Sequence, residues 1–326
     1  MLSLAFGLVN GVHDAGNAIA APVVTRALRP GPAVVLAAVF HVLGAVVLGT
    51  AVAATVAGII AVPATQTLVV VGAAVTGALI WNSATLWWGL PCSSGHCLVG
   101  ALAGAALAEG GTGAVHWGGL DGLRPVGVWG SLIWLVLSTA VAVPLAALGI
   151  ALATRVLRRA TRAVTRPVRG GEVATSAALA FAHGSNDAQK TMGLITLALV
   201  GAGRLPRFAV PWWVVLTAAA VLTLGTSRGG GRVVRTIGRR IYHLRSIDGL
   251  VAQGSSAGIV LTASVLGAPV STTDVVAPAV VGTGAGARSH HVRWLVVSEI
   301  ALAWLVTLPV SAALGALALP LWRWLG

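Results

Sequence analysis

The chain has 326 residues, of which 57% are hydrophobic and only 9% are charged, and its mean hydropathy is +0.91. Soluble globular domains carry about 25% charged residues, so this composition excludes a soluble protein and predicts an all-α polytopic membrane protein. The formal net charge of +13 does not indicate nucleic-acid binding, because the arginines are clustered and aromatic residues are almost absent between them.

Long apolar runs recur along the chain, and several exceed the roughly 20 residues that cross a hydrocarbon core. We therefore expect some of these segments to be tilted or broken. The runs cover residues 32–62, 68–88, 126–153, 173–200, 210–224, 250–266 and 292–321.

The first polar interruption is the segment Asn10-Gly-Val-His-Asp-Ala-Gly-Asn-Ala18. Ionisable groups inside a membrane segment cost several kcal/mol and are kept mainly for function. We predict that Asp14 and Asn17 bind a coupling cation. His13 is a candidate for a proton path, since its unperturbed pKa lies near neutrality; the other interpretation is that it bonds a neighbouring carbonyl and supports a helix break.

The second interruption, Trp88-Gly-Leu-Pro-Cys-Ser-Ser-Gly-His96, predicts a helix break, because Pro91 removes a donor and restricts the preceding residue. Irregular backbone at membrane depth survives only inside protein or beside a wet cavity. We predict a re-entrant helical hairpin over residues 90–107, with a kinked spanning helix as the alternative. Cys92 and Cys97 lack the paired spacing of a zinc site, so we expect buried thiols and no metal site.

Two basic segments follow, one between residues 155 and 169 and one between residues 228 and 245. The positive-inside rule and attraction to anionic lipid place both on the cytoplasmic side. The first of these basic segments divides the chain into a first transmembrane repeat (1–154), a cytoplasmic Arg-rich linker (155–171) and a second transmembrane repeat (172–326).

The second repeat contains a related acidic motif, Phe181-Ala-His-Gly-Ser-Asn-Asp-Ala-Gln-Lys190, which includes the only lysine of the chain. We predict that Asn186, Asp187 and Gln189 bind the coupling cation. Lys190 lies three residues after the aspartate, so it can pair with that carboxylate or contact an anion as a point charge. We favour a shared role. His183 is expected to support a helix break.

A second break, Leu266-Gly-Ala-Pro-Val-Ser-Thr-Thr-Asp274, predicts another re-entrant hairpin over residues 268–286. The recurrence of both motifs in the same order indicates a duplication. Between its acidic motif and its helix break, the first repeat has an uncharged loop near residues 54–66, and the second repeat has the second basic segment at the same place. Equivalent loops of opposite charge character are expected on opposite sides of the membrane if the two repeats have inverted topology.

Helix N-termini at the hairpin tips suit a tetrahedral oxyanion. The predicted anion-binding side chains are Ser93, Ser94, His96, Lys190, Ser271, Thr272 and Thr273. Asp14 and Asp187 would repel such an anion unless a cation lies between them or they are protonated, which predicts cation-coupled transport.

All four motifs together resemble the inorganic phosphate transporter family, the Pit-type secondary carriers. The resemblance implies phosphate symport at the bilayer midplane between inverted repeats, in a homodimer. The Gln189-Lys190 pair of this chain is similar to that of the bacterial branch of the family, which implies proton coupling and transport of metal-phosphate. The chain departs from the family pattern at Gly95, Gln253 and Asp274. We expect Asp274 to join the coupling-ion residues and to accept a hydrogen bond from protonated phosphate, which sulfate cannot donate.

The predicted function is therefore phosphate symport across a bacterial plasma membrane, with H⁺ or Na⁺ as the coupling cation and no cofactor. The alternatives are a sulfate permease, a decayed non-transporting subunit and an intramembrane enzyme. No catalytic motif supports an enzyme. We expect the remaining acidic side chains to be solvated or orienting charges: Glu109, Asp121, Glu172, Asp248 and Glu299.

Overall fold

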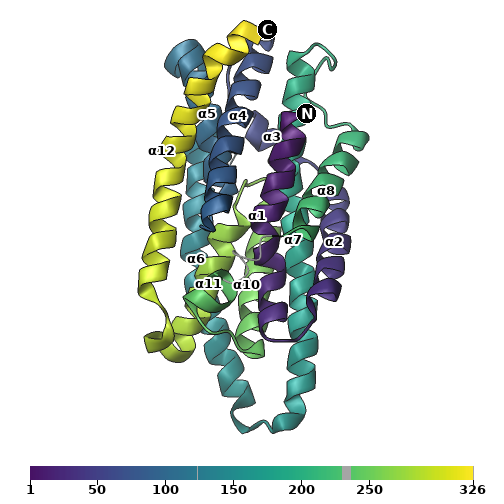
Figure 1. The fold of residues 1–326 in the computed structure, drawn as a ribbon, viewed down its shortest axis with the longest axis vertical. Helices are drawn as coiled ribbons and strands as arrows, with labels where there is room; N and C mark the ends of the chain where they lie inside the picture. Colours follow the sequence, from purple (N-terminus) through teal and green to yellow (C-terminus); the bar gives the residue numbers. More distant parts are fainter. Residues whose placement is uncertain (123, 230–235, 326) are drawn as a thin grey trace.

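The computed structural model describes residues 1–122, 124–229 and 236–325, and it is almost entirely helical. The long helices run roughly along the long axis of the molecule (Figure 1). Among the described residues, five helical segments are long and apolar enough to cross a membrane: Pro30–Val47, Ala64–Trp88, Ser94–Ala114, Gly127–Arg159 and Trp294–Leu325. The prediction of an all-α polytopic membrane protein is confirmed.

The N-terminal part contains six α-helices, three short 3-10 turns and one small hairpin among the described residues. They are α1 (Leu2–Val24), α2 (Pro30–Val47), α3 (Ala51–Ala57), α4 (Ala64–Trp88), α5 (Ser94–Gly110), η1 (Gly111–Ala114), β1 (Gly119–Asp121), β2 (Arg124–Val126), α6 (Gly127–Val156), η2 (Leu157–Arg159) and η3 (Arg162–Val164). Strands β1 and β2 pair antiparallel, with Leu120 opposite Pro125.

In the C-terminal part, the described residues form α7 (Thr165–Gly201), α8 (Trp212–Ser227), η4 (Thr236–Ile241), α10 (Ser246–Val265), α11 (Thr272–Arg288), η5 (Ser289–His291) and α12 (Trp294–Leu325). Helix α7 begins inside the segment that we predicted as a linker. The α6–α7 connection lies at the end of the molecule opposite both termini (Figure 1). Of the second basic segment, Arg232 and Arg235 lie outside the described residues.

Both predicted helix breaks are present, one between α4 and α5 and the other between α10 and α11. Each begins at a glycine with a left-handed backbone, Gly89 with φ 70° and Gly267 with φ 71°, a conformation that costs other L-residues about 1–2 kcal/mol. Helices α4 and α5 lie in the upper part of Figure 1, and α10 and α11 in the lower part. The first turns of α5 and α11 meet, since the Ser93 hydroxyl donates to Asp274. The re-entrant hairpins and the inverted-topology relation between the repeats stay predictions.

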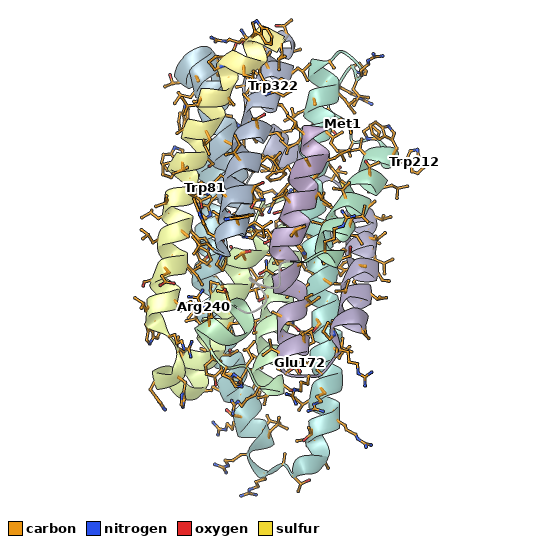
Figure 2. All side chains as sticks on the ribbon, viewed as in Figure 1. Met1, Trp81, Glu172, Trp212, Arg240 and Trp322 are labelled. Carbon is orange, nitrogen blue, oxygen red and sulfur yellow. The ribbon has the colours of Figure 1, made fainter. Side chains whose placement is uncertain are left out.

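Two acidic residues that we expected to be solvated or orienting charges are buried. Glu172 is fully buried and accepts a hydrogen bond of 2.7 Å from the Thr25 hydroxyl; it lies toward the end of the molecule opposite Trp322 (Figure 2). Asp248 is fully buried and forms a capping ion pair of 2.9 Å with Arg245 at the start of α10. Thr25 and Arg245 supply these carboxylates with donors inside the fold, as buried polar groups require.

Helices α2 and α7 pack closely because glycine lies at their contact. A Cβ atom on Gly44 would clash with the backbone carbonyl of Phe181, and one on Gly184 would clash with the carbonyl of His41. This close approach brings His41 of α2 against His183 of α7, with ring centroids 4.6 Å apart.

We expect Gly44→Ala to lower the stability of the folded protein, because the added methyl group meets backbone atoms that cannot move aside. Overpacking of this kind costs about 1–3 kcal/mol. Thermal unfolding in detergent measures the effect. Gly31→Ala is the matched control in the same helix, since nothing lies within 4 Å of its added Cβ; equal melting temperatures for the two variants would contradict the prediction.

Candidate functional site

The two acidic motifs and the two helix breaks come together in the interior. Helix α1 supplies Asp14, helix α7 supplies Asp187, and the first turns of α5 and α11 supply hydroxyl groups. Both aspartates are fully buried, as are the hydroxyl-bearing residues Ser93, Ser94, Ser271, Thr272 and Thr273 within 1%. The site is therefore occluded from both ends of the molecule.

Asp187 has donors on both carboxylate oxygens. Its Oδ1 accepts from the Lys190 ammonium at 2.6 Å, with the Asn10 amide and the Ser94 hydroxyl each at 3.4 Å. Its Oδ2 accepts from the Thr272 hydroxyl at 2.6 Å. Lys190 also donates to the Ser94 hydroxyl at 3.3 Å. The carboxylate thus contacts the first turns of α5 and α11 and a buried ammonium group.

Asp14 has only neutral donors. Its Oδ1 accepts from the Asn17 amide at 3.0 Å and from the Thr273 hydroxyl at 2.7 Å, while its Oδ2 has no hydrogen-bond partner. The Asn17 carbonyl oxygen is also buried without a partner. Unpaired buried acceptors are costly, and these two oxygens are available to a further donor or cation.

The first turns of α5 and α11 contact each other through Ser93 and His96, which we predicted to bind the anion, and Asp274, which we predicted to bind the coupling cation. Ser93 caps α5 by accepting from the His96 amide at 3.2 Å, and its hydroxyl donates to Asp274 Oδ2. His96 Nδ1 lies 3.1 Å from the same carboxylate oxygen. Asp274 Oδ1 and the Ser271 hydroxyl are buried without partners, which leaves hydrogen-bonding capacity beside this contact.

The residues directly before each aspartate hold the broken backbone in place. His13 Nε2 lies 3.0 Å from the Leu90 carbonyl oxygen and 3.0 Å from the Cys92 amide nitrogen. In the other repeat, Asn186 donates to the Ala268 carbonyl at 3.1 Å. Leu90 and Ala268 each precede the proline of a break. These contacts correspond to the break-supporting interpretation of His13.

Gln189, predicted among the coupling-ion residues, is hydrogen-bonded to backbone groups. Its carbonyl oxygen accepts from the Val52 amide at 2.8 Å, at the start of α3, and its amide donates to the Ser185 carbonyl at 2.6 Å. Both polar atoms of the side chain are thus used to attach α3 to α7. Gln253 is also engaged, donating to the Ala18 carbonyl at 3.2 Å.

A pair of histidines extends the site, and sequence reasoning missed one of them. His183 Nε2 lies 3.3 Å from Asp187 Oδ2 and 3.9 Å from Asp14 Oδ2, and its Nδ1 lies 2.9 Å from His41 Nε2. His41 in turn contacts the Thr226 hydroxyl at 3.3 Å. The available signal was that His41 is the one ionisable side chain in the apolar run 32–62.

Asp14, His183 and Asp187 form a group that can hold a metal ion, because one ligand atom from each lies within 4.8 Å of the other two. Carboxylate oxygen and imidazole nitrogen are ordinary ligands for divalent transition metals. The cysteines are not part of this group: Cys92 and Cys97 are both free and buried, as predicted.

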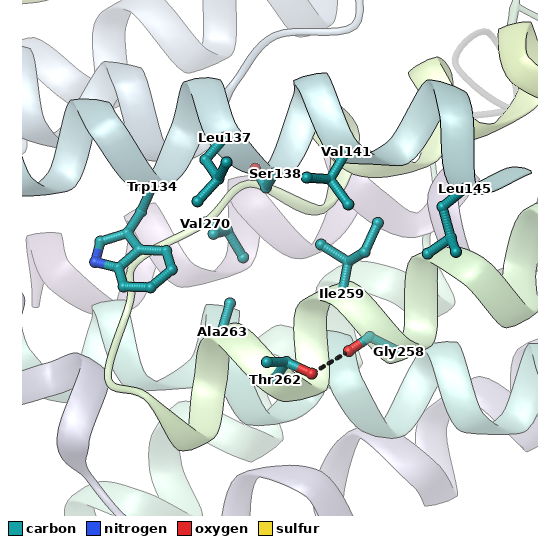
Figure 3. A pocket seen from close by; sticks show the side chains of 10 residues that line it. All are labelled: Trp134, Leu137, Ser138, Val141, Leu145, Gly258, Ile259, Thr262, Ala263 and Val270. Atoms are coloured by element: carbon teal, nitrogen blue, oxygen red, sulfur yellow. Dashed lines mark hydrogen bonds between the residues drawn. The ribbon is translucent and has the colours of Figure 1, made fainter. Parts of the chain in front are cut away.

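A separate pocket of about 280 Å³ lies between α6 and α10 (Figure 3). Its walls are mostly apolar, including Trp134, Leu137 and Ile259. The Thr262 hydroxyl donates to the Gly258 carbonyl at 2.8 Å, and Ser138 donates to the Leu135 carbonyl, so neither is turned toward a solute. No charged side chain is among the residues that line this pocket, so it lacks the positive group that favours an oxyanion.

The sequence matches known transporters over almost its full length. A profile of the phosphate transporter family matches residues 10–315. A probable low-affinity inorganic phosphate transporter of Mycobacterium tuberculosis (strain ATCC 25618 / H37Rv) is 38% identical over 331 residues, covering 99% of this chain and 76% of the relative. One of the same description from Bacillus subtilis (strain 168) is 37% identical, covering 97% and 93%.

A solved structure described as the sodium-dependent phosphate transporter superposes with a TM-score of 0.85 at 22% sequence identity, covering 100% of this chain and 98% of that one. At this identity the likeness establishes the fold alone. The matched family and relatives are transporters and not enzymes, which confirms both the resemblance and the prediction that the chain is not an enzyme. By its sequence match from residue 10 to residue 315, this chain belongs to the phosphate transporter family.

Proposed function

We propose that this protein is a symporter that moves inorganic phosphate across a bacterial plasma membrane together with a cation, with the proton as the expected driving ion. The observation that carries the proposal is the occluded cluster in which two buried aspartates lie against the hydroxyl-rich tips of two broken helices. The relatives' description as inorganic phosphate transporters supports phosphate as the solute.

The charges in this cluster explain why a cation is needed. Asp14, Asp187 and Asp274 are all fully buried, and Lys190 is the one always-charged cation bonded to them among the described residues. A phosphate that approaches this cluster meets excess negative charge, and in a low-dielectric interior that repulsion is large. A cation bound beside Asp14 removes the repulsion, so cation and phosphate bind favourably only together.

Radiolabelled phosphate uptake into proteoliposomes tests this function. We expect uptake against a phosphate gradient when a proton gradient is imposed, and its loss when an ionophore collapses that gradient; a parallel sodium gradient identifies sodium coupling instead. Unlabelled sulfate should compete weakly, because the free oxygen of Asp274 accepts a hydrogen bond from protonated phosphate. Uptake that neither gradient drives would contradict the proposal, and sulfate competing as well as phosphate would indicate a sulfate permease.

A metal-phosphate complex is a second candidate for the solute. The group of ligand atoms from Asp14, His183 and Asp187 favours it, since nitrogen and oxygen donors together suit divalent transition metals. Phosphate uptake that requires Mn²⁺ or Zn²⁺ and co-transports the labelled metal would establish this form, whereas unchanged uptake in the presence of a chelator would exclude it. The homodimer implied by the family resemblance is likewise a proposal, to be measured as the mass of the protein in nanodiscs.

A further inference from the structure

The position three residues after each aspartate is occupied by Asn17 in one motif and by Lys190 in the other. The two side chains make equivalent contacts. Asn17 donates to Asp14 Oδ1 at 3.0 Å and to the Thr273 hydroxyl of α11 at 2.9 Å. Lys190 donates to Asp187 Oδ1 at 2.6 Å and to the Ser94 hydroxyl of α5 at 3.3 Å. Each therefore links its own aspartate to a hairpin tip, but only one of them carries a charge.

Because of this difference, Asp187 is paired with a cationic side chain and Asp14 is paired with a neutral one. The Lys190 side chain is 1% exposed, and its ion pair with Asp187 is shielded from water and salt. Both oxygens of Asp187 have donors. Asp14 instead has a free Oδ2, and the carbonyl oxygen of Asn17 is also buried without a partner. Two unused acceptors therefore remain on the Asp14 side, where no lysine or arginine is bonded to the carboxylate among the described residues.

We propose that Lys190 is a tethered cation that permanently fills the cation position of Asp187, so that the mobile coupling cation binds only at Asp14. This inference rests on the proposed symport and specifies its stoichiometry. An ammonium held at 2.6 Å by a covalent side chain cannot leave with the solute. The protein therefore carries one cation fewer per cycle than a site in which both aspartates recruit ions from solution.

The tethered cation also explains why the first turn of α5 lies beside Asp187. Ser94 accepts from Lys190 while its own hydroxyl lies 3.4 Å from Asp187 Oδ1. The ammonium thus keeps the α5 tip beside the aspartate without any bound ion. At Asp14, the Thr273 hydroxyl of α11 donates directly to the carboxylate. A mobile cation strengthens the attachment of α11 to Asp14 only while it is bound. We infer that loading of the site depends on the Asp14 side.

Lys190→Asn tests the proposal, because it places at this position the residue that serves Asp14. We expect the purified variant to bind an additional ²²Na⁺ ion per chain relative to the unmodified protein, since Asp187 regains a vacant acceptor and gains an amide carbonyl oxygen. Phosphate uptake by the variant should become Na⁺-dependent. Lys190→Arg, which keeps the charge, should gain no ²²Na⁺ binding, and Lys190→Asn combined with Asp187→Asn should lose the gain.

A second variant tests the same idea from the other repeat. Asn17→Lys installs a fixed cation beside Asp14, and we expect the loss of whatever cation dependence the unmodified protein shows. Unchanged ²²Na⁺ binding in Lys190→Asn, with only weaker phosphate affinity, would make Lys190 an anion contact and overturn the proposal. So would cation dependence retained in Asn17→Lys. If the unmodified protein moves no phosphate, the proposed symport fails by itself, and the ²²Na⁺ binding comparison still decides the role of Lys190.

Discussion

An Asp14→Asn protein is expected to lose phosphate uptake while its fold remains as stable as that of the unmodified chain. The donors on Asp14 are neutral, and the amide oxygen of asparagine can still accept from Asn17 and Thr273. What disappears is the negative charge with a free Oδ2. If that charge contributes about 3 kcal/mol to cation binding, its loss lowers cation affinity by a factor of about 100.

Uptake into proteoliposomes and thermal unfolding in detergent, measured on the same preparation, separate these two effects. Asp121→Asn is the matched control, because Asp121 is an exposed aspartate in strand β1, far from the buried cluster in sequence. It should transport normally. Normal uptake by the Asp14→Asn protein would remove the coupling scheme, and a large drop in its melting temperature would show that Asp14 serves the fold instead.

Asp187→Asn is expected to behave differently, with both uptake and stability lost. The Lys190 ammonium lies 2.6 Å from this carboxylate, and both side chains are fully buried. Removing one partner leaves an uncompensated charge inside the protein, which costs about 3–5 kcal/mol. The same change at Asp14 leaves no buried cation behind, so the contrast between the two aspartates comes from Lys190 alone.

The double variant Asp187→Asn, Lys190→Met distinguishes charge from packing. Methionine keeps the length of the side chain and removes its charge, so the double variant should unfold at a higher temperature than Asp187→Asn while remaining inactive. A melting temperature no higher than that of the single variant would show that the carboxylate acts through its hydrogen bonds to Thr272 and Ser94 rather than through its charge.

The sequence alone was enough to predict the features that depend on local composition. Apolar length predicts membrane helices, and a proline after glycine predicts a break, so Gly89-Leu-Pro91 and Gly267-Ala-Pro269 were both located correctly. Charged groups in apolar surroundings indicated Asp14 and Asp187 as functional, since membrane segments rarely keep such groups otherwise. The four motifs together were also specific enough to indicate the family.

Only the tertiary structure decided which polar groups meet. The contacts of His183 with His41, of Ser93 with Asp274 and of Gln189 with the start of α3 join residues 142, 181 and 137 positions apart. Sequence spacing describes one helix face, whereas these contacts depend on how separate helices pack. For the same physical reason, the sequence did not show that Glu172 is buried, because its donor Thr25 comes from the distant C-terminal end of α1. The sequence determined the segments, the chemistry they carry and the lysine three residues after Asp187, and packing determined which hydroxyl and imidazole groups from distant helices meet the two aspartates.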